Sequence, residues 1–425
     1  MKIFQITLFT ICFYVILTQV AFSQTKPDIT LYGRMQLMGF GQSVTDNVES
    51  NNRVYLYLKE ARFGITGTEA DMKLDIQIAF GGEDVIVAPN PGISLQLLDF
   101  SIDAPLISSI RFKAGQFKVP YGREGLTNSG YLSFGDRSIQ NNAFVVGRDV
   151  GAAVYGTSGS LTGVLGIFTG GGRDIPIKYL PERLGLPMVV LRVGVNNGYD
   201  EDILTVKQTD YNLSPGSAFY VNGLYTEDSR IGHSTVLNVK SSDKSLLIDG
   251  NWNPFITATP LDRGTLWQVG ADAAYRCSLN GTTLAFGEAE VNFGSYKNMY
   301  GSLAATGGRL QVGIDQRPYE FAIRYAFIQP DSKFSYVASN HQSYPIVNNQ
   351  LIHEVTLGAS CFLSNNHLKL TADLPILIQV PVINDPVSGA YVLTQQPDQV
   401  VYVATGGKID RQNVVQARVQ LQYIF

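Results

Sequence analysis

Basic side chains are concentrated between positions 111 and 148 of this chain. They are Arg111, Lys113, Lys118, Arg123, Arg137 and Arg148, and the same stretch holds only two acidic residues, Glu124 and Asp136. Six basic minus two acidic residues gives a local charge of +4, in a chain whose net charge is −4. Cationic side chains around a water-filled path lower the energetic barrier for anions and raise it for cations. The stretch therefore predicts an anion-selecting site, provided that the fold arranges it around a pore.

The expected positions of these residues divide them into two groups. By the alternation of their predicted strands, Arg111, Lys113 and Arg148 can face the inside of a barrel. The other three belong to a long connection, residues 118–147. If that connection folds into the bore, it carries its basic residues to the narrowest point. The alternative for Arg123 and Arg137 is that they pair with Glu124 and Asp136 and fix the connection to the wall. The sequence leaves both roles open.

Residues that catalysis or metal binding would need are not found in the required spacing. The four histidines are His233, His341, His353 and His367, and no two of them have a metal-ligand spacing. The sequence contains no Gly-x-Ser-x-Gly elbow, phosphate-binding loop or paired-cysteine motif. A net charge of −4 provides no overall basic field for nucleic acid. We therefore predict no enzymatic activity, no catalytic residue, no metal, no cofactor and no nucleic-acid partner.

In the last twelve residues, Val414 to Phe425, the odd positions from Val415 are apolar and the even positions from Gln416 are polar except for Ile424. Such alternation indicates a strand with one apolar face, and its length suits a strand that crosses a bilayer, roughly 9–11 residues. Tyr423 and Phe425 lie where an aromatic girdle would be expected. A terminal strand that ends on phenylalanine resembles the assembly signal of bacterial outer-membrane barrels, and such a strand would pair with the first strand to remove both sheet edges.

Alternating strands recur along the chain between turn residues, which predicts an all-β architecture. The first is Thr30 to Phe40, and Met72 to Phe80 alternates without error. Only 16% of the residues are charged, against about 25% in soluble domains, as expected if many apolar side chains face lipid. We predict a transmembrane antiparallel β-barrel of 16 strands. An 18-stranded barrel remains possible if Thr235 to Lys240 and Ser245 to Trp252 also cross the membrane.

Connection lengths divide into two sets. Turns near Ser364, Asp315 and Asn280 are short and lie on the side of the chain termini, whereas connections 294–308, 329–350 and 375–410 are long and lie opposite. Outer-membrane barrels have short periplasmic turns and long extracellular loops. Cys277 and Cys361 are expected four strand steps apart, at roughly 4.8 Å per step, too far for a disulfide.

The N-terminus predicts export. Lys2 precedes a mostly apolar run from Ile3 to Val20, and Ala21-Phe22-Ser23 is a small-x-small cleavage site. We therefore predict a signal peptide over residues 1–23 and a barrel over residues 24–425, placed in the outer membrane of a Gram-negative cell.

Several segments resemble the phosphate-selective porin O and P family. The most specific are Lys113 to Leu126 and Tyr131 to Ser138, and shorter likenesses occur at Gly147–Gly151, Gly166–Gly170, Tyr319–Tyr325 and His367–Leu370. The resemblance implies a water-filled, usually trimeric outer-membrane channel, and the family name implies a preference for anions. Its expected partners are outer-membrane lipid, the barrel-assembly machinery, two further copies of the chain and small anions or other small solutes.

The sequence thus favours a porin for passive diffusion of small hydrophilic solutes, with mild preference for phosphate-like anions. Two alternatives remain. A channel that binds sugars or oligosaccharides would need an aromatic ladder inside the bore, and the 22 tyrosines and 22 phenylalanines permit one. A purely structural barrel would have its bore plugged.

Overall fold

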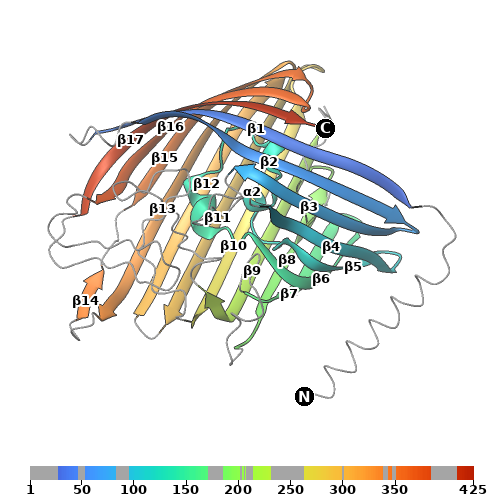
Figure 1. Ribbon diagram of the computed structural model, residues 1–425, viewed down its shortest axis with the longest axis horizontal. Helices are drawn as coiled ribbons and strands as arrows, with labels where there is room; N and C mark the ends of the chain where they lie inside the picture. Colours follow the sequence, from blue (N-terminus) through green and yellow to red (C-terminus); the bar gives the residue numbers. More distant parts are fainter. Residues whose placement is uncertain are drawn as a thin grey trace.

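The protein is a closed antiparallel β-barrel of 16 strands (Figure 1). The computed structural model describes residues 27–45, 53–82, 95–170, 185–201, 203–204, 206, 214–230, 263–298, 301–337, 343–346, 351–383 and 409–425. None of the helices in these ranges has the length and apolar character needed to span a bilayer. The predicted signal peptide, residues 1–23, lies outside the described residues.

The wall strands follow one another in chain order, each hydrogen-bonded to its neighbours. They are β1 (Asp28–Val44), β2 (Arg53–Glu69), β3 (Met72–Gly82), β4 (Gln96–Ile107), β5 (Ile110–Lys118), β6 (Arg148–Ser158), β7 (Leu161–Phe168), β8 (Met188–Asn197), β9 (Gly216–Arg230), β10 (Arg263–Ser278), β11 (Leu284–Asn298), β12 (Gly301–Gln316), β13 (Tyr319–Val337), β15 (Ile352–Ser364), β16 (Leu368–Ile383) and β17 (Ile409–Ile424). A short strand, β14 (Ser343–Ile346), pairs with the far end of β13.

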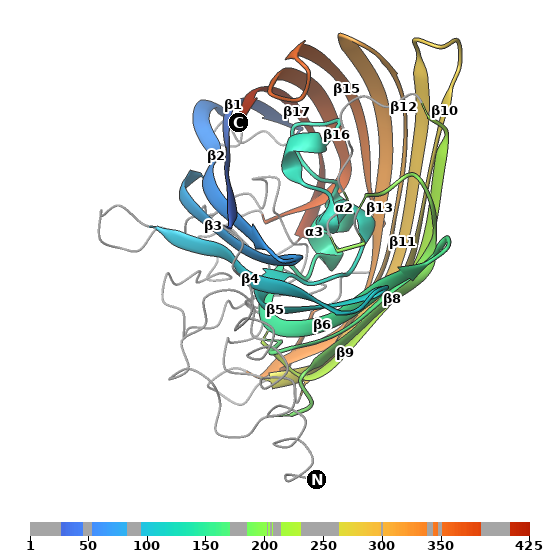
Figure 2. The same ribbon diagram turned by 90° about the vertical axis from the view of Figure 1, so that its right-hand side faces the viewer.

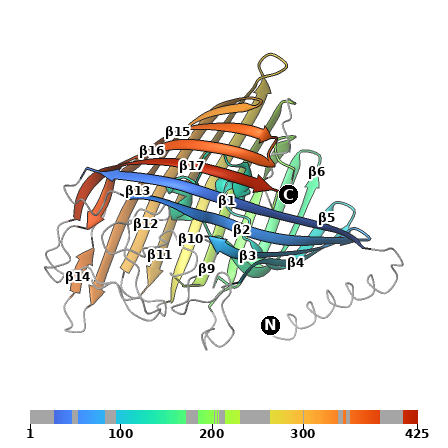
Figure 3. The same ribbon diagram turned by 45° about the horizontal axis from the view of Figure 1, so that its top comes forward.

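The predicted closure by the last strand is confirmed. β17 pairs with β1 over the register Arg34↔Ile424 to Val44↔Val414, and the two strands lie side by side in Figure 3. Gly33 and Phe425 exchange both backbone hydrogen bonds, at 3.0 and 3.2 Å. Each described wall strand is thus paired on both sides, which satisfies the backbone as a bilayer-spanning barrel requires.

The predicted division of β17 into an apolar outer face and a polar inner face is also confirmed. On β17 the apolar side chains Val419 and Leu421 are exposed on the outer surface, while Gln420 and Gln422 are buried inside. Free Cys277 and Cys361 lie on β10 and β15, four strand steps apart, as predicted.

The alternative of 18 strands is not supported at the wall. β9 pairs directly with β10 from Arg276↔Gly216 to Arg263↔Arg230, so no further strand is inserted between them. The segments 235–240 and 245–252 lie outside the described residues. One predicted connection is wrong: β11 and β12 continue as a paired ladder to Asn298↔Gly301, so residues 294–308 belong mostly to strands.

A β-bulge on β2 turns two charged side chains inward. The register skips Lys59 between Glu60↔Gln36 and Leu58↔Leu37. A bulge places an extra residue on one strand and re-aims the side chains there. As a result Lys59 and Glu60 are both buried, at 3% and 4% exposure, although they are neighbours in sequence.

Two connections fold into the barrel. The inner loop, residues 119–147, joins β5 to β6 and contains α2 (Arg123–Leu126), η2 (Ser129–Tyr131) and α3 (Ile139–Phe144); Figure 2 shows α2 and α3 inside the ring of strands. The periplasmic arm, residues 198–215, joins β8 to β9, and its described residues include buried Tyr199, Leu204 and Val206. The arm is the exception to the predicted short periplasmic turns.

We predict that deletion of Phe425 impairs assembly. The deletion removes both backbone hydrogen bonds to Gly33 and the ring that packs over that glycine, where an added Cβ would lie 2.4 Å from the ring. The amount of heat-modifiable, membrane-embedded barrel should fall sharply on gel electrophoresis. Phe425→Tyr retains the backbone and the ring and should assemble normally. Wild-type amounts of the deletion variant would contradict the prediction.

Candidate pore constriction

Hydrogen bonds within the inner loop hold its two short helices together. Gly122, with φ 72°, takes a left-handed conformation that favours glycine, and α2 begins directly after it. The Ser138 hydroxyl accepts a hydrogen bond from the backbone N–H of Asn141 at 3.2 Å and caps α3. The Glu124 carboxylate accepts from the backbone N–H of Ser138 at 3.1 Å, which joins α2 to α3.

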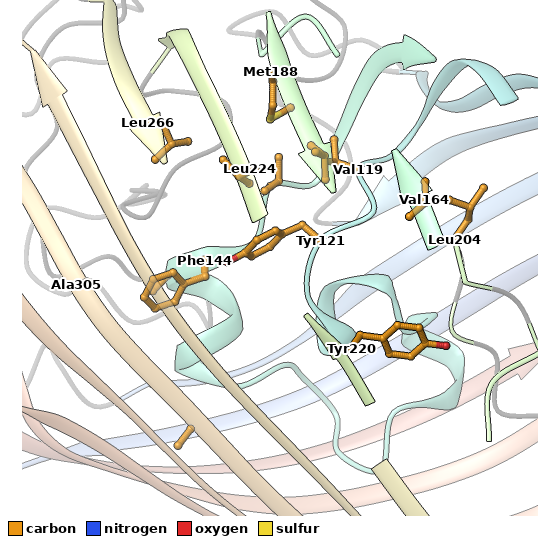
Figure 4. Close-up of a cluster of buried hydrophobic side chains, with 14 of the residues drawn as sticks. Val119, Tyr121, Phe144, Val164, Met188, Leu204, Tyr220, Leu224, Leu266 and Ala305 are labelled. Atoms are coloured by element: carbon orange, nitrogen blue, oxygen red, sulfur yellow. The ribbon is translucent and has the colours of Figure 1, made fainter. Parts of the chain in front are cut away.

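Apolar side chains pack the loop against part of the wall. Figure 4 shows Val119, Tyr121 and Phe144 of the loop together with Leu224 and Leu266 of strands β9 and β10. Phe144 is only 1% exposed and lies beside Gly307 of β12, where an added Cβ would be 2.5 Å from the ring. Burying such a side chain stabilises by about 1.5–3 kcal/mol.

Arg123 is held from two sides by carboxylates and has no exposed surface. Its Nη1 and Nη2 donate to the two oxygens of Asp200 at 2.9 and 2.8 Å, and its Nε donates to Asp272 at 3.0 Å. Asp272 also accepts from Nη1 and Nη2 of Arg192 at 2.6 and 3.1 Å. The four charges balance, which suits their complete burial.

Glu124 occupies a second ionic cluster. Its carboxylate lies 3.2 Å from Nη1 of Arg324 and 3.5 Å from Nε of Arg309, both on the wall. Glu354 lies 2.6 Å from Nη2 of Arg324 and also accepts from the backbone N–H of Ile139 at 2.8 Å. Wall residues of β12, β13 and β15 therefore hold both helices of the loop.

The middle of the loop is held by the bulge and by the closing strands. Lys59 lies 3.1 Å from Asp136, and Glu60 accepts from the Ser129 hydroxyl at 2.9 Å. Lys369 of β16 donates to the carbonyls of Gly130 and Leu132 at 3.2 and 2.9 Å. Both charges that the bulge turns inward thus contact the loop.

The two carboxyl groups of the loop have pKa values below those of free carboxyl groups. Although burial opposes ionisation, Arg309 and Arg324 hold the pKa of Glu124 below its ordinary value of 4.5. Burial likewise opposes ionisation of Asp136, but Lys59 and Arg418 hold its pKa below the ordinary 3.8. Both loop carboxylates therefore remain charged at neutral pH.

Solvent contact differs between the two sides of the bore. Most charged and aromatic side chains on the inner face of β2 to β6 keep partial exposure: Arg62, Asp75, Asp99, Arg111, Lys113, Arg148 and Tyr155. The exceptions there are buried Lys59, Glu60, Asp103 and Asp149. Charged side chains on the inner face of β8 to β17 are buried: Arg192, Asp272, Glu288, Arg309, Arg324, Glu354 and Arg418. The water-accessible side of the bore therefore follows β2 to β6.

Five of the six basic residues singled out in the sequence retain solvent contact, and they fall into two groups. Arg111 pairs with Asp103 at 2.6 Å and Arg148 with Asp99 at 2.8 Å, so their charges are partly compensated. The other three are Lys113, Lys118 and Arg137, and they have no carboxylate partner among the described residues. The sixth, Arg123, is the fully buried residue of the first cluster.

The three cations without carboxylate partners have weak or neutral partners. Lys118 donates to the carbonyls of Gly125, Leu126 and Thr127 at 3.0 to 3.2 Å, at the end of α2. Arg137 donates to the carbonyls of Glu124 and Thr127 at 3.1 and 2.8 Å. Lys113 lies 5.2 Å from the ring centre of Phe117. In direct contact, their positive charges therefore meet only carbonyl dipoles and a ring face among the described residues, while Asp99 acts on Lys113 and Lys118, and Glu60 on Arg137, at longer range.

A cavity of about 10 Å³ lies between α3 and the wall, lined by Arg137, Arg324, Glu354 and Gln416 among others. It has room for a single water, not for a polyatomic anion. In the described part of the chain, no group of three or more His, Cys, Asp or Glu residues is arranged to hold a metal.

Sequence reasoning missed the partners of the loop. Glu124 and Asp136 were considered as partners of Arg123 and Arg137, but Glu124 pairs with Arg309 and Arg324, and Asp136 with Lys59. Asp200 was assigned to a region without clear pattern. The sequence did contain one indication of these partners. Asp272 and Arg324 alternate with apolar residues along their strands, which predicts that both side chains face the bore.

The comparisons with known proteins agree with this architecture. The family model for phosphate-selective porin O and P matches residues 29–254, more than half of the 425-residue chain. The chain belongs to the phosphate-selective porin O and P family. Its members are porins, which are passive channels rather than enzymes.

Solved porin structures share the fold at low sequence identity. The anion-selective porin from Comamonas acidovorans has 14% identity and a TM-score of 0.55, over 94% of this chain and 100% of that one. The OmpT variant of Vibrio cholerae that lacks loop L8 has 10% identity and a TM-score of 0.51, over 94% and 100%. The outer-membrane channel DcaP of Acinetobacter baumannii has 12% identity and a TM-score of 0.50, over 95% and 99%. No curated protein sequence matches this porin.

The porin's inner loop should stay in place until the pH falls below the ordinary pKa of glutamate. A carboxylate whose folded pKa is lowered stabilises the fold above its unfolded pKa, and that contribution is lost as the pH falls through the folded pKa. Resistance of the loop to proteolysis should therefore be constant from pH 7 to about 4.5 and decline only in stronger acid.

Glu124→Gln should increase proteolysis of the loop at pH 7, because Arg309 and Arg324 lose a buried partner. Breaking a buried pair costs about 3–5 kcal/mol. Glu69→Gln, at the turn between β2 and β3, is the control and should cleave like wild type. Equal cleavage of the Glu124→Gln variant and wild type at pH 7 would contradict the anchoring role.

Proposed function

We propose that this porin prefers small anions and that they pass along the β2 to β6 side of the bore. Lys113, Lys118 and Arg137 would form the cationic part of the constriction. Arg111 and Arg148 would contribute more weakly, because each is paired with an aspartate. Arg123 would anchor the loop without meeting the solute, since it has no exposed surface.

The observation that carries the proposal is the absence of carboxylate partners for three partly exposed cations within the described residues. On the same side, the acidic side chains Asp99 and Asp103 are bound to arginines. Three further wall carboxylates there are also bound: Asp75 accepts from the hydroxyls of Tyr32 and Thr66 at 2.7 and 3.1 Å, Glu60 pairs with Arg34 and Arg62, and Asp149 accepts from the backbone N–H of Gly170 at 2.6 Å. The local charge is thus positive although the chain is negative overall.

The magnitude expected from these charges is modest. A unit charge 6–8 Å from a permeating ion contributes about 0.5–0.7 kcal/mol in water before screening. Salt at physiological strength reduces this over a Debye length of about 8 Å. A few such charges favour anions several-fold and still allow fast release, which suits diffusion of phosphate-like ions better than tight binding.

A second candidate function is passage of sugars, and one feature favours it. Phe40 of β1 and Tyr55 of β2 are stacked with ring centres 4.9 Å apart, and Tyr57 lies 5.5 Å from Tyr55. Tyr55 and Tyr57 face inward, because Val54 and Leu56, which alternate with them on β2, are exposed on the outside. Phe40 of β1 is buried on the same inner face. Cross-strand aromatic pairs also stabilise sheets. Block of the ionic current by an oligosaccharide, relieved in Tyr55→Ala, would support this candidate.

The remaining proposals concern export and assembly. Residues 1–23 would be removed as a signal peptide, and Tyr423 and Phe425 would be read by the barrel-assembly machinery. The mature chain, surrounded by outer-membrane lipid, would form a homotrimer. Mass spectrometry of the mature N-terminus and native mass measurement of the purified porin test the first and the last.

Lys113→Gln should lower anion preference without altering the loop, because Lys113 is the cation with the fewest loop contacts. Removing it weakens attraction for anions and repulsion of cations together, so the anion-to-cation permeability ratio should fall by roughly twofold. The ratio is obtained from the zero-current potential across a tenfold salt gradient.

Lys73→Gln is the matched control, since Lys73 is an exposed lysine at the start of β3; its ratio should remain near wild type. Arg137→Lys retains the charge and should keep the ratio that Arg137→Gln loses. Cation preference of the wild type, or equal effects at Lys73 and Lys113, would overturn the proposed anion path.

A further inference from the structure

The periplasmic arm reaches the underside of the inner loop. Tyr199, Leu204 and Val206 are 3%, 2% and 1% exposed, so these side chains of the arm are buried. The arm begins at the periplasmic end of β8, whereas the inner loop begins at the opposite end of β5. Two segments from opposite ends of the barrel therefore meet in the bore.

Their contact is the doubly hydrogen-bonded pair of Arg123 and Asp200. The side chains are 0% and 1% exposed, and both oxygens of Asp200 accept from the guanidinium. Two parallel hydrogen bonds fix the orientation of the pair as well as its distance. Aromatic rings hold the guanidinium further: its carbon lies 5.2 Å from the ring centre of Tyr199 and 5.8 Å from that of Tyr220.

The arm is itself fixed to the wall before it meets the loop. Arg276 of β10 donates to the carbonyls of Tyr199 and Ser214 at 3.2 and 3.0 Å. The side chain of Asn196 accepts from the backbone N–H groups of Tyr199 and Asp200 at 3.0 and 3.1 Å. Tyr199 donates its hydroxyl to Glu288 at 3.1 Å. Asp200 is thus presented to the loop from a rigid support.

The second carboxylate beside Arg123 cannot replace Asp200. Asp272 already accepts two hydrogen bonds from Arg192 and one from Asn222 at 3.0 Å. Without Asp200, the cluster would hold two arginines and one aspartate in a site that excludes water. A buried charge without its own partner is unfavourable by several kcal/mol, so the start of α2 would move toward water.

We propose that Asp200 is a positioning residue of the constriction. The periplasmic arm holds the start of α2 through Asp200 and Arg123, and this keeps the inner loop over the β8 to β17 side of the bore. Solutes are thereby confined to the β2 to β6 side, past Lys113 and Arg137. The contact between Arg123 and Asp200 is called the latch below. The inference rests on the proposed anion path, but the latch itself is tested separately by single-channel conductance.

The test is single-channel recording of the full-length porin in planar bilayers, with Asp200→Asn against wild type. Asparagine keeps the size of the side chain and removes its charge. We expect a larger conductance level whose occupancy rises on the order of a hundredfold, about 2.8 kcal/mol at 1.4 kcal/mol per factor of ten. In that level the anion-to-cation permeability ratio should fall, because Glu288 and Glu290 of the opened side become accessible.

Two further variants separate positioning from a general loss of stability. Asp200→Glu restores the carboxylate and should return most of the wild-type conductance. Asp315→Asn removes the same charge from a site beside Arg317 at the β12 turn and should leave conductance and selectivity unchanged. If Asp200→Asn does not assemble, Arg123→Lys is the alternative variant. Lysine keeps the positive charge but cannot make two parallel hydrogen bonds to the carboxylate, so this variant should show the larger conductance level.

Wild-type conductance in assembled Asp200→Asn or Arg123→Lys would overturn the latch, whatever the ion preference. Cation preference of the wild type would overturn the anion path while leaving the latch untouched. An equal conductance change in Asp315→Asn would also count against the latch, because it would show that any lost bore charge has the same effect.

Discussion

Burial of charge inside a closed barrel is the constraint on which the rest of this structure depends. The wall satisfies its own backbone, so the fold of the barrel does not require the inner loop. The loop, in contrast, carries Arg123 and Glu124 into places from which water is excluded, and Asp136 into a site where its side chain keeps 15% exposure. Each of these charges is stable there only with an opposite charge in contact, and each has one.

The wall supplies those partners by devices that are local in sequence. The bulge on β2 turns Lys59 and Glu60 inward together, whereas a regular strand would send one of them to lipid. Alternation on β12, β13 and β15 delivers the arginines and glutamates that hold the two helices. The periplasmic arm supplies Asp200 from below. The loop is therefore drawn to one side of the bore, and the opposite side keeps its contact with water.

The barrel was largely predictable because period-two alternation is a local signal. This alternation, together with the terminal strand, predicts the closure of the barrel, the side of the wall on which each side chain lies, and the number of strands. The bulge was not predictable, since Leu58-Lys59-Glu60-Ala61 reads equally well with either register. The partners of the loop were not predictable either, because Arg123 and Asp200 lie 77 positions apart and only the folded barrel brings them together. Residues 294–308 were predicted as a connection, whereas β11 and β12 stay paired as far as Asn298↔Gly301.

The central claim is that water and solutes follow the β2 to β6 side while the inner loop seals the other. Substituted-cysteine labelling in membranes, in a Cys277→Ser and Cys361→Ser background, measures this most directly. Two matched pairs of inward-facing positions suit it: Gln77 and Thr66 on the open side, which are partly exposed, and Gln311 and Thr356 on the sealed side, at 6% and 0% exposure. The account predicts rapid reaction of a charged thiol reagent with Gln77→Cys and Thr66→Cys, and little with Gln311→Cys and Thr356→Cys. Equal labelling of both sides in the intact porin would contradict it.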